Sequence, residues 1–165
     1  MARRGNSGNR RSAARLAAVQ ALYQLAISEG DVEQVIAEFT CHRLGEVVDG
    51  VDLVKPDRAL FAELVRGVAR NRRDLDDMIA AVLVEDWTIE RLETLLACIL
   101  RAGVHELADR GDVPSRVVIS EYVDLADAFY GDKETGLVNG VLDRLARELR
   151  PAELAVPGDG GKPGR

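Results

Sequence analysis

Residues 57–82 read DRALFAELVRGVARNRRDLDDMIAAV, and this stretch decides the fold class. Within it, positions 61, 64, 68, 75, 78 and 82 hold apolar side chains, and Asn71 is the one polar residue in the same series. Steps of three and four residues keep one face of an α-helix apolar along its whole length. Asp57, which follows Pro56, is a suitable N-cap. We therefore predict one long helix that bends near Asn71 and packs at a shallow angle on its neighbours.

The same spacing recurs on both sides of this segment, with a Gly- and Asp-containing loop predicted at 45–56. Gly30 is suited to end the first helix, Thr88 to cap the fourth, and Pro114 to occupy the first turn of the fifth. The spacing runs through Asn139-Gly140, so we expect Gly140 to mark a close helix–helix contact. Besides the long helix, helices are predicted at about 10–29, 31–43, 89–109, 114–129 and 137–149.

No strand pattern of alternating apolar residues is present, and the predicted helices fall into two groups. The predicted fold is all-α, with two packed three-helix bundles in a domain that spans residues 10–150. Its subdomains are expected at about 10–86 and 87–150. The Gly-, Ser- and Arg-rich residues 1–9 are predicted to form a disordered basic arm, and the Pro/Gly-rich residues 151–165 a disordered tail.

The composition indicates an ordinary cytoplasmic protein with a real core. The chain has 165 residues and 47% hydrophobic content, but only 4% aromatic residues, so the core must be mainly aliphatic. No apolar run approaches the roughly 20 residues of a membrane span. The two cysteines, Cys41 and Cys98, lie far apart in the sequence, as expected for a reducing compartment.

Positive charge is concentrated at the N-terminus, although the whole chain has a net charge of −6. Every charged residue before Glu29 is an arginine, at positions 3, 4, 10, 11 and 15. Spacings of seven and four residues place three of them, at 4, 11 and 15, along one side of a helix. Guanidinium groups bind phosphate well, and we predict that Arg10, Arg11 and Arg15 contact nucleic-acid phosphates. A solvated basic tail is the alternative.

A second group of arginines, at positions 66, 70, 72 and 73, lies in the middle of the long helix. Asp74, Asp76 and Asp77 follow directly, and we interpret this segment as a surface whose charges pair with one another. A second phosphate-binding site is the less favoured interpretation.

The familiar catalytic and metal-binding motifs are absent from the sequence. It contains no CxxC, HExxH or GxSxG motif and no phosphate-binding glycine loop. Cys41 and His42 are adjacent on a predicted helix and therefore point apart. His105 falls in an apolar helix, where we expect it to belong to the core. We predict no enzymatic activity, no metal site and no cofactor.

Three longer motifs occur in a fixed order, and together they are specific. They are RRSAARLAAVQALY at 10–23, DVPSRVVISEYVDLA at 112–126 and LVNGVLD at 137–143. They resemble the NusB family of transcription antitermination factors, and the resemblance covers roughly residues 10–149. It implies a pair of helical bundles that binds a short single-stranded leader RNA element, boxA, together with NusE, a small-subunit ribosomal protein. It also implies association with the transcription elongation complex at ribosomal RNA operons.

The resemblance also implies a second RNA contact at 131–139, with Lys133, Leu137 and Asn139 as its candidates. Leu137 replaces the aromatic residue typical of the family, and leucine cannot stack on a base as an aromatic ring does. Lys133 offers compensating charge, and Asn139 offers an amide that donates and accepts. Burial of Leu137 in the core is the alternative. Tyr23 is our candidate contact for NusE, with an ordinary core tyrosine as the alternative.

Two other functions stay open on the sequence alone. The chain could be the NusB-like accessory domain of a ribosomal RNA cytosine methyltransferase, or a helical scaffold that binds no RNA. The methyltransferase function requires an additional α/β cofactor-binding domain, and the sequence has no glycine-rich loop for one. Salt-dependent binding of boxA-like RNA distinguishes the first function from a scaffold.

Overall fold

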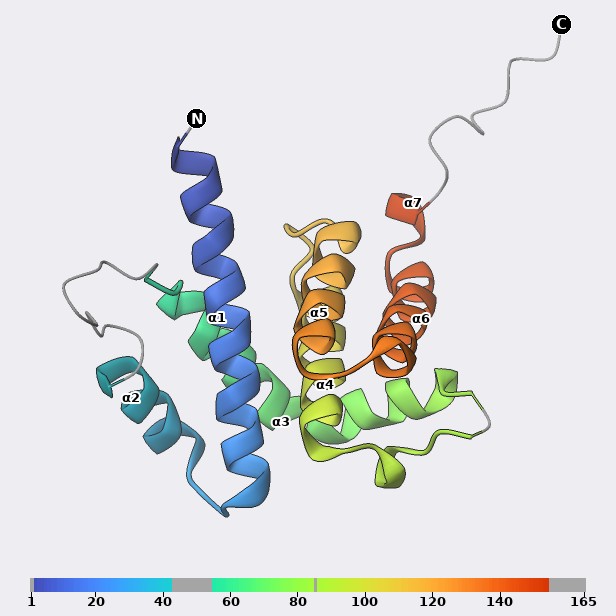
Figure 1. Cartoon of the computed structure of the whole chain (residues 1–165), viewed down its shortest axis with the longest axis horizontal. Helices are drawn as coiled ribbons and strands as arrows, with labels where there is room; N and C mark the ends of the chain where they lie inside the picture. Colours follow the sequence, from blue (N-terminus) through green and yellow to red (C-terminus); the bar gives the residue numbers. More distant parts are fainter. Residues whose placement is uncertain (1, 43–54, 85, 155–165) are drawn as a thin grey trace, which may run out of the picture.

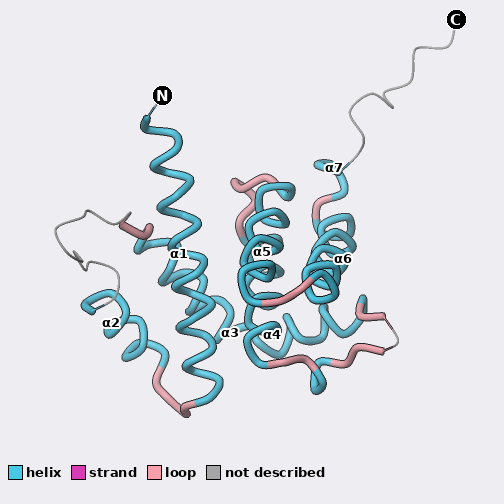
Figure 2. The backbone as a smooth tube through the Cα atoms, in the orientation of Figure 1, coloured by secondary structure: helices cyan, strands magenta, loops and turns pink. Residues whose placement is uncertain are grey.

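The structure is a computed structural model that describes residues 2–42, 55–84 and 86–154. The all-α prediction is confirmed, and no strand occurs in these three ranges (Figure 2). The elements are α1 (Ala2–Ile27), α2 (Val32–His42), α3 (Arg58–Val82), the 3₁₀ turn η1 (Ile89–Arg91), α4 (Thr94–Asp109), α5 (Ser115–Phe129), α6 (Asp132–Leu149) and α7 (Pro151–Leu154).

Helix α4 is the centre of the molecule. It packs against α1 and α3 on one side and against α5 and α6 on the other (Figure 1). Every residue from Leu96 to Leu107 is buried, as expected of a helix with neighbours all around it. The helices before and after residue 85 therefore share one continuous apolar core.

The long helix α3 forms as its sequence predicts. The Asp57 side chain caps it by accepting a hydrogen bond of 3.0 Å from the Leu60 amide. Asn71 has φ −106° and ψ 16°, which is outside the helical range and produces the predicted bend. The close helix–helix contact occurs at Gly67, not at the predicted Gly140. A Cβ on Gly67 would lie 2.2 Å from Cε1 of His105, whereas one on Gly140 would meet no atom within 4 Å.

Several helix boundaries differ from the prediction. Helix α1 begins at Ala2, so the predicted disordered arm is helical from that residue onward. Helix α6 begins at Asp132, not at residue 137, because Asp132 and Glu134 in its first turn favour a helix N-terminus. Thr88 makes no side-chain capping bond, and α4 starts only at Thr94.

The C-terminal segment contains a short helix where a disordered tail was predicted. Glu153, on α7, accepts a hydrogen bond of 3.0 Å from the Ser115 amide and another from the Ser115 hydroxyl. These bonds fix α7 to the first turn of α5. The rest of the predicted tail, and most of the predicted loop at 45–56, lies outside the described residues.

Candidate nucleic-acid interface

Arg10 and Arg11 lie on the N-terminal half of α1. The first turns of this helix project beyond the rest of the helical body (Figure 1). The Arg10 side chain is exposed, and its Nε donates a hydrogen bond of 3.1 Å to the Lys55 carbonyl. The Arg10 carbonyl accepts one of 3.0 Å from the Asp57 amide, which ties this part of α1 to the start of α3. Within the described residues, neither arginine forms an ion pair.

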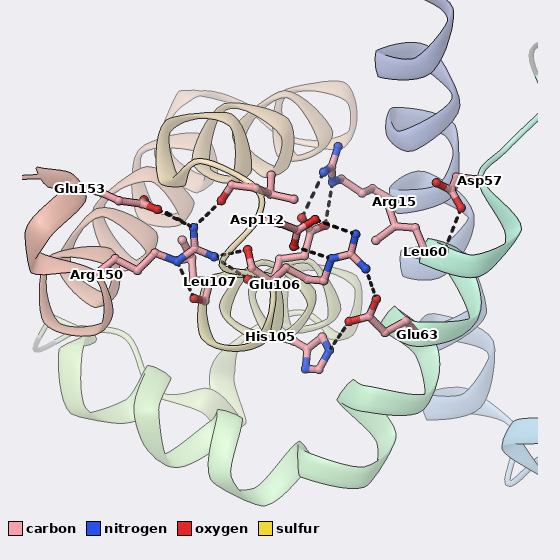
Figure 3. A network of polar contacts seen from close by, with 12 residues as sticks. Arg15, Asp57, Leu60, Glu63, His105, Glu106, Leu107, Asp112, Arg150 and Glu153 are labelled. Atoms are coloured by element: carbon pink, nitrogen blue, oxygen red, sulfur yellow. Dashed lines mark hydrogen bonds and ion pairs between the residues drawn. The ribbon is translucent and has the colours of Figure 1, made fainter.

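Arg15 lies in the core, so the prediction that it faces solvent and RNA is wrong. Its side chain is 1% exposed. Nε and one terminal nitrogen donate to the two carboxylate oxygens of Glu106, at 2.7 and 3.1 Å (Figure 3). The other terminal nitrogen lies 3.7 Å from Oε2 of Glu121. The guanidinium is thus occupied by acids of α4 and α5 and leaves no face for a phosphate.

Tyr122 completes this buried group. Its hydroxyl donates a 2.7 Å hydrogen bond to Oε1 of Glu106. Burial, together with the Glu106 carboxylate, raises the pKa of Tyr122 well above its ordinary value, so the phenol keeps its proton. The group joins α1, α4 and α5, and thereby holds the helix that carries Arg10 and Arg11.

The predicted second contact forms one wall of a groove of about 360 Å³. The groove lies between the end of α3, the connection that follows it, and α6. Leu137 is buried and belongs to the apolar core, which is the alternative given for it, and the 9% of its surface that stays exposed lines the groove. The exposed Lys133 stands at the edge of the groove. Asn139 is exposed but does not line it. The described lining residues are Val82, Val84, Trp87, Lys133, Gly136, Leu137, Gly140, Val141, Asp143 and Arg144.

Trp87 is the residue in this groove that the sequence analysis missed. Nζ of Lys133 lies 5.0 Å from the centroid of the Trp87 ring, close enough for a cation–π interaction. The signal in the sequence was the only tryptophan of the chain, placed in a polar connection rather than in an apolar stripe.

The two predicted contact regions lie at opposite ends of α3. Arg10 is bonded to Asp57, before the first residue of this helix, whereas Val82, its last residue, lines the groove. At 1.5 Å per residue, a helix of 25 residues separates them by up to roughly 35 Å. One nucleotide therefore cannot touch both, and an RNA that uses both must run along the body.

The arginines in the middle of α3 were predicted to pair with the aspartates that follow them. Among the described residues, no such pair forms. Arg66 makes two hydrogen bonds, of 2.7 and 2.8 Å, to Glu33 of α2. Asp76 accepts from Arg101 of α4, at 2.6 Å. Arg66 and Asp76 thus find their partners on neighbouring helices.

Tyr23 is 38% exposed, near the end of α1, so it is not an ordinary core tyrosine. The described residues contain no group of three or more His, Cys, Asp or Glu side chains placed to hold a metal ion. Within the same residues, no helix is both long and apolar enough to cross a membrane.

The sequence matches the family model of the NusB family over residues 12–147. The chain belongs to the NusB family. Transcription antitermination protein NusB from Rhizobium johnstonii is 49% identical over 144 residues, which cover 87% of this chain and 90% of the relative. The protein of the same name from Bradyrhizobium diazoefficiens is 48% identical over 146 residues, 88% of each chain.

Solved NusB structures share the fold. T. maritima NusB superposes with a TM-score of 0.71 at 28% identity, over 88% of this chain and 97% of that one. The structure of antitermination factors NusB and NusE in complex with dsRNA gives a TM-score of 0.67 at 25% identity, over 83% and 96%. Membership of the NusB family thus accounts for the all-helical architecture and for the three motifs.

Proposed function

We propose that this chain is a cytoplasmic RNA-binding transcription antitermination factor. It binds a boxA-type single-stranded leader RNA together with a NusE-type ribosomal protein, and so supports processive transcription of ribosomal RNA operons. Relatives that are 49% identical carry the name transcription antitermination protein, and a structural neighbour was solved with NusE and RNA. The observation that carries the proposal is a groove with an exposed lysine and a half-buried tryptophan on an otherwise acidic protein.

Charge supports local rather than global contact with RNA. A net charge of −6 repels a polyanion from most of the surface. The N-terminal half of α1 and the edge of the groove, with Lys133 and Arg144, are the exceptions. Asp143 also lines the groove, but it accepts a 3.0 Å hydrogen bond from Arg147, which offsets its negative charge.

The two regions are assigned different tasks. Arg10 and Arg11 bind phosphates and give affinity for any sequence, whereas Lys133, Leu137 and Asn139 lie where bases and their phosphates meet α6. Arg15 supports the first region indirectly, because its buried ion pair fixes α1 to the body.

A titration of labelled single-stranded leader RNA, with and without the NusE-type protein and at two salt concentrations, tests this function. We expect binding that strengthens when the partner is added and weakens as salt rises. Duplex RNA of the same sequence serves as the competitor. A helical scaffold with no RNA role would show no salt-dependent binding under either condition, and that result would refute the proposal.

Loss of the α1 arginines should reduce the salt dependence without unfolding the protein. Arg10→Ala and Arg11→Ala each remove one phosphate contact, so the slope of log K against log salt should flatten by about 0.7 per variant. Stability should change by no more than about 0.5 kcal/mol, as for most surface substitutions. Arg73→Ala removes the same charge from α3 and is the matched control. Equal slopes for all three variants would remove Arg10 and Arg11 from the interface.

Tyr23 is proposed to contact the NusE-type partner, because its aromatic side chain is exposed near the end of α1. Tyr23→Phe deletes only the hydroxyl and Tyr23→Ala deletes the whole ring. We expect the alanine variant to lose at least about 1 kcal/mol of partner affinity, the usual threshold for a significant interface residue. Calorimetric titration with the partner measures it, and unchanged affinity in both variants would place the partner elsewhere.

A further inference from the structure

Trp87 is half-buried against the core and lines two depressions of opposite charge. Its amide donates a 2.9 Å hydrogen bond to the Val84 carbonyl, after the end of α3. On one side of Trp87 lies the groove lined by Lys133, Arg144 and Asp143, of which Asp143 is paired with Arg147. On the other side is a depression of about 370 Å³ whose lining includes Asp76, Asp77 and Glu90. The indole therefore forms a wall between a cationic and an acidic surface.

The groove beside Trp87 suits a flat aromatic ligand attached to an anion. Val82, Leu137 and Val141 contribute apolar side chains, and the positions of Gly136 and Gly140 on α6 leave open space. Its volume of about 360 Å³ falls in the usual range for small-ligand sites, about 300–1,000 Å³. A nucleobase stacks on such a ring whatever its identity, because every base has a π-face.

Charge decides which side of the ring the ligand uses. Nζ of Lys133 lies 5.0 Å from the centroid of the Trp87 ring, and Arg144 lies about three turns further along the same face of α6, so phosphates of a bound strand find cations there. The acidic depression behind the ring repels phosphate. Leu137, in the same groove, offers apolar contact but no π-face. Trp87 is the only aromatic residue among the described residues that line the groove.

From these observations we infer that Trp87 is the base-stacking residue of the RNA site. An RNA base packs on the indole in the groove, and the Lys133 ammonium moves from the ring to an adjacent phosphate. Trp87 thereby performs the stacking that Leu137 cannot. This inference rests on the proposed RNA-binding function and adds to it the residue that holds the base.

Because the chain contains one tryptophan, its fluorescence reports on this site directly. The experiment titrates the full-length protein with a short single-stranded RNA oligonucleotide and follows two signals. Anisotropy of a label on the RNA reports binding, and indole emission reports stacking. We expect the emission of Trp87 to be quenched in parallel with binding, and its accessibility to acrylamide to fall.

Two variants extend the test. Trp87→Leu removes the ring and should weaken RNA binding roughly 5- to 150-fold, the equivalent of about 1–3 kcal/mol for one stacked base. Trp87→Phe keeps a π-face and should retain most of the affinity. Thermal melting followed by circular dichroism checks that both variants fold. If a variant does not fold, the fluorescence experiment on the wild-type protein still tests the inference.

The outcomes separate the two proposals. If the RNA binds but the emission and acrylamide accessibility of Trp87 do not change, Trp87 is not the stacking residue, and the proposed function still stands. Equal affinity of Trp87→Leu and the wild-type protein leads to the same conclusion. If the wild-type protein binds no RNA, alone or with the NusE-type partner, both proposals are overturned.

Discussion

Arg15→Ala should destabilise the protein by about 3–5 kcal/mol, the cost typical of breaking a buried ion pair from one side. The substitution leaves the Glu106 carboxylate, which is 0% exposed, without the two hydrogen bonds that the guanidinium donates. Tyr122 donates one remaining bond to it, which is not enough to replace the positive charge. The midpoint of urea unfolding should fall accordingly, and RNA affinity should be measured only where the variant is folded.

Arg11→Ala is the matched control for this prediction, because Arg11 lies one turn earlier on α1 and is only half-buried. Its effect on stability should stay within about 0.5 kcal/mol. A double variant, Arg15→Met with Glu106→Leu, removes both charges and should recover part of the loss, since it leaves no unpaired buried ion. If Arg15→Ala were as mild as Arg11→Ala, the buried pair would not hold α1 in place.

Arg150→Ala should also lower the free energy of unfolding by several kcal/mol, because its guanidinium donates hydrogen bonds to carbonyls at the C-terminal end of α4. It donates to the carbonyls of Leu107 at 2.8 Å, Glu106 at 2.9 Å and Arg110 at 2.6 Å, and also to that of Val113 (Figure 3). The last carbonyls of a helix lack partners within it. The Glu106 and Arg110 carbonyls keep backbone donors, the amides of Arg110 and Val113, so the substitution removes the donor mainly from the Leu107 and Val113 carbonyls. Each buried acceptor left without a donor costs about 1–3 kcal/mol.

Arg150→Lys should rescue only a part of this stability, because a single ammonium cannot reach carbonyls spread around a planar fork. Arg147→Ala, in the last turn of α6 just before Arg150, breaks an exposed pair with Asp143 and should lower the free energy of unfolding by no more than about 0.5 kcal/mol. Thermal and urea unfolding of the three variants give the comparison. Full stability of Arg150→Lys would show that charge alone, not the set of hydrogen bonds, is what α4 requires.

Local patterns were sufficient for most of the fold. The one polar residue in the α3 stripe marked its bend, and apolar spacing located α2 and α5 to within a few residues. The start of α6 was missed because Asp132-Lys133-Glu134 has the composition of a loop, although the same acids favour a helix N-terminus. Gly140 was assigned a contact that Gly67 makes, because spacing shows which residues share a face but not which neighbour approaches it.

The site was less predictable, since it depends on contacts between distant segments. Arg15 looked like part of a surface stripe, and only the structure shows that Glu106, 91 positions away, comes to meet it. The sequence did hold one signal that Arg15 faces the core: it lies three residues before the buried Ala18 and seven before the buried Leu22, on the same face of α1. Trp87 gave no periodic signal at all, and its proximity to Lys133 follows from the packing of α3 against α6.

The most direct test of the RNA path is photocrosslinking of thiouridine-substituted leader RNA to the full-length protein with its NusE-type partner, followed by mass spectrometry of the peptides. We predict crosslinks at Trp87 and in the α6 segment from Lys133 to Leu137, and further crosslinks on α1 around Arg10 and Arg11. Crosslinks confined to the arginines in the middle of α3, with none at Trp87 or on α1 and α6, would contradict the account.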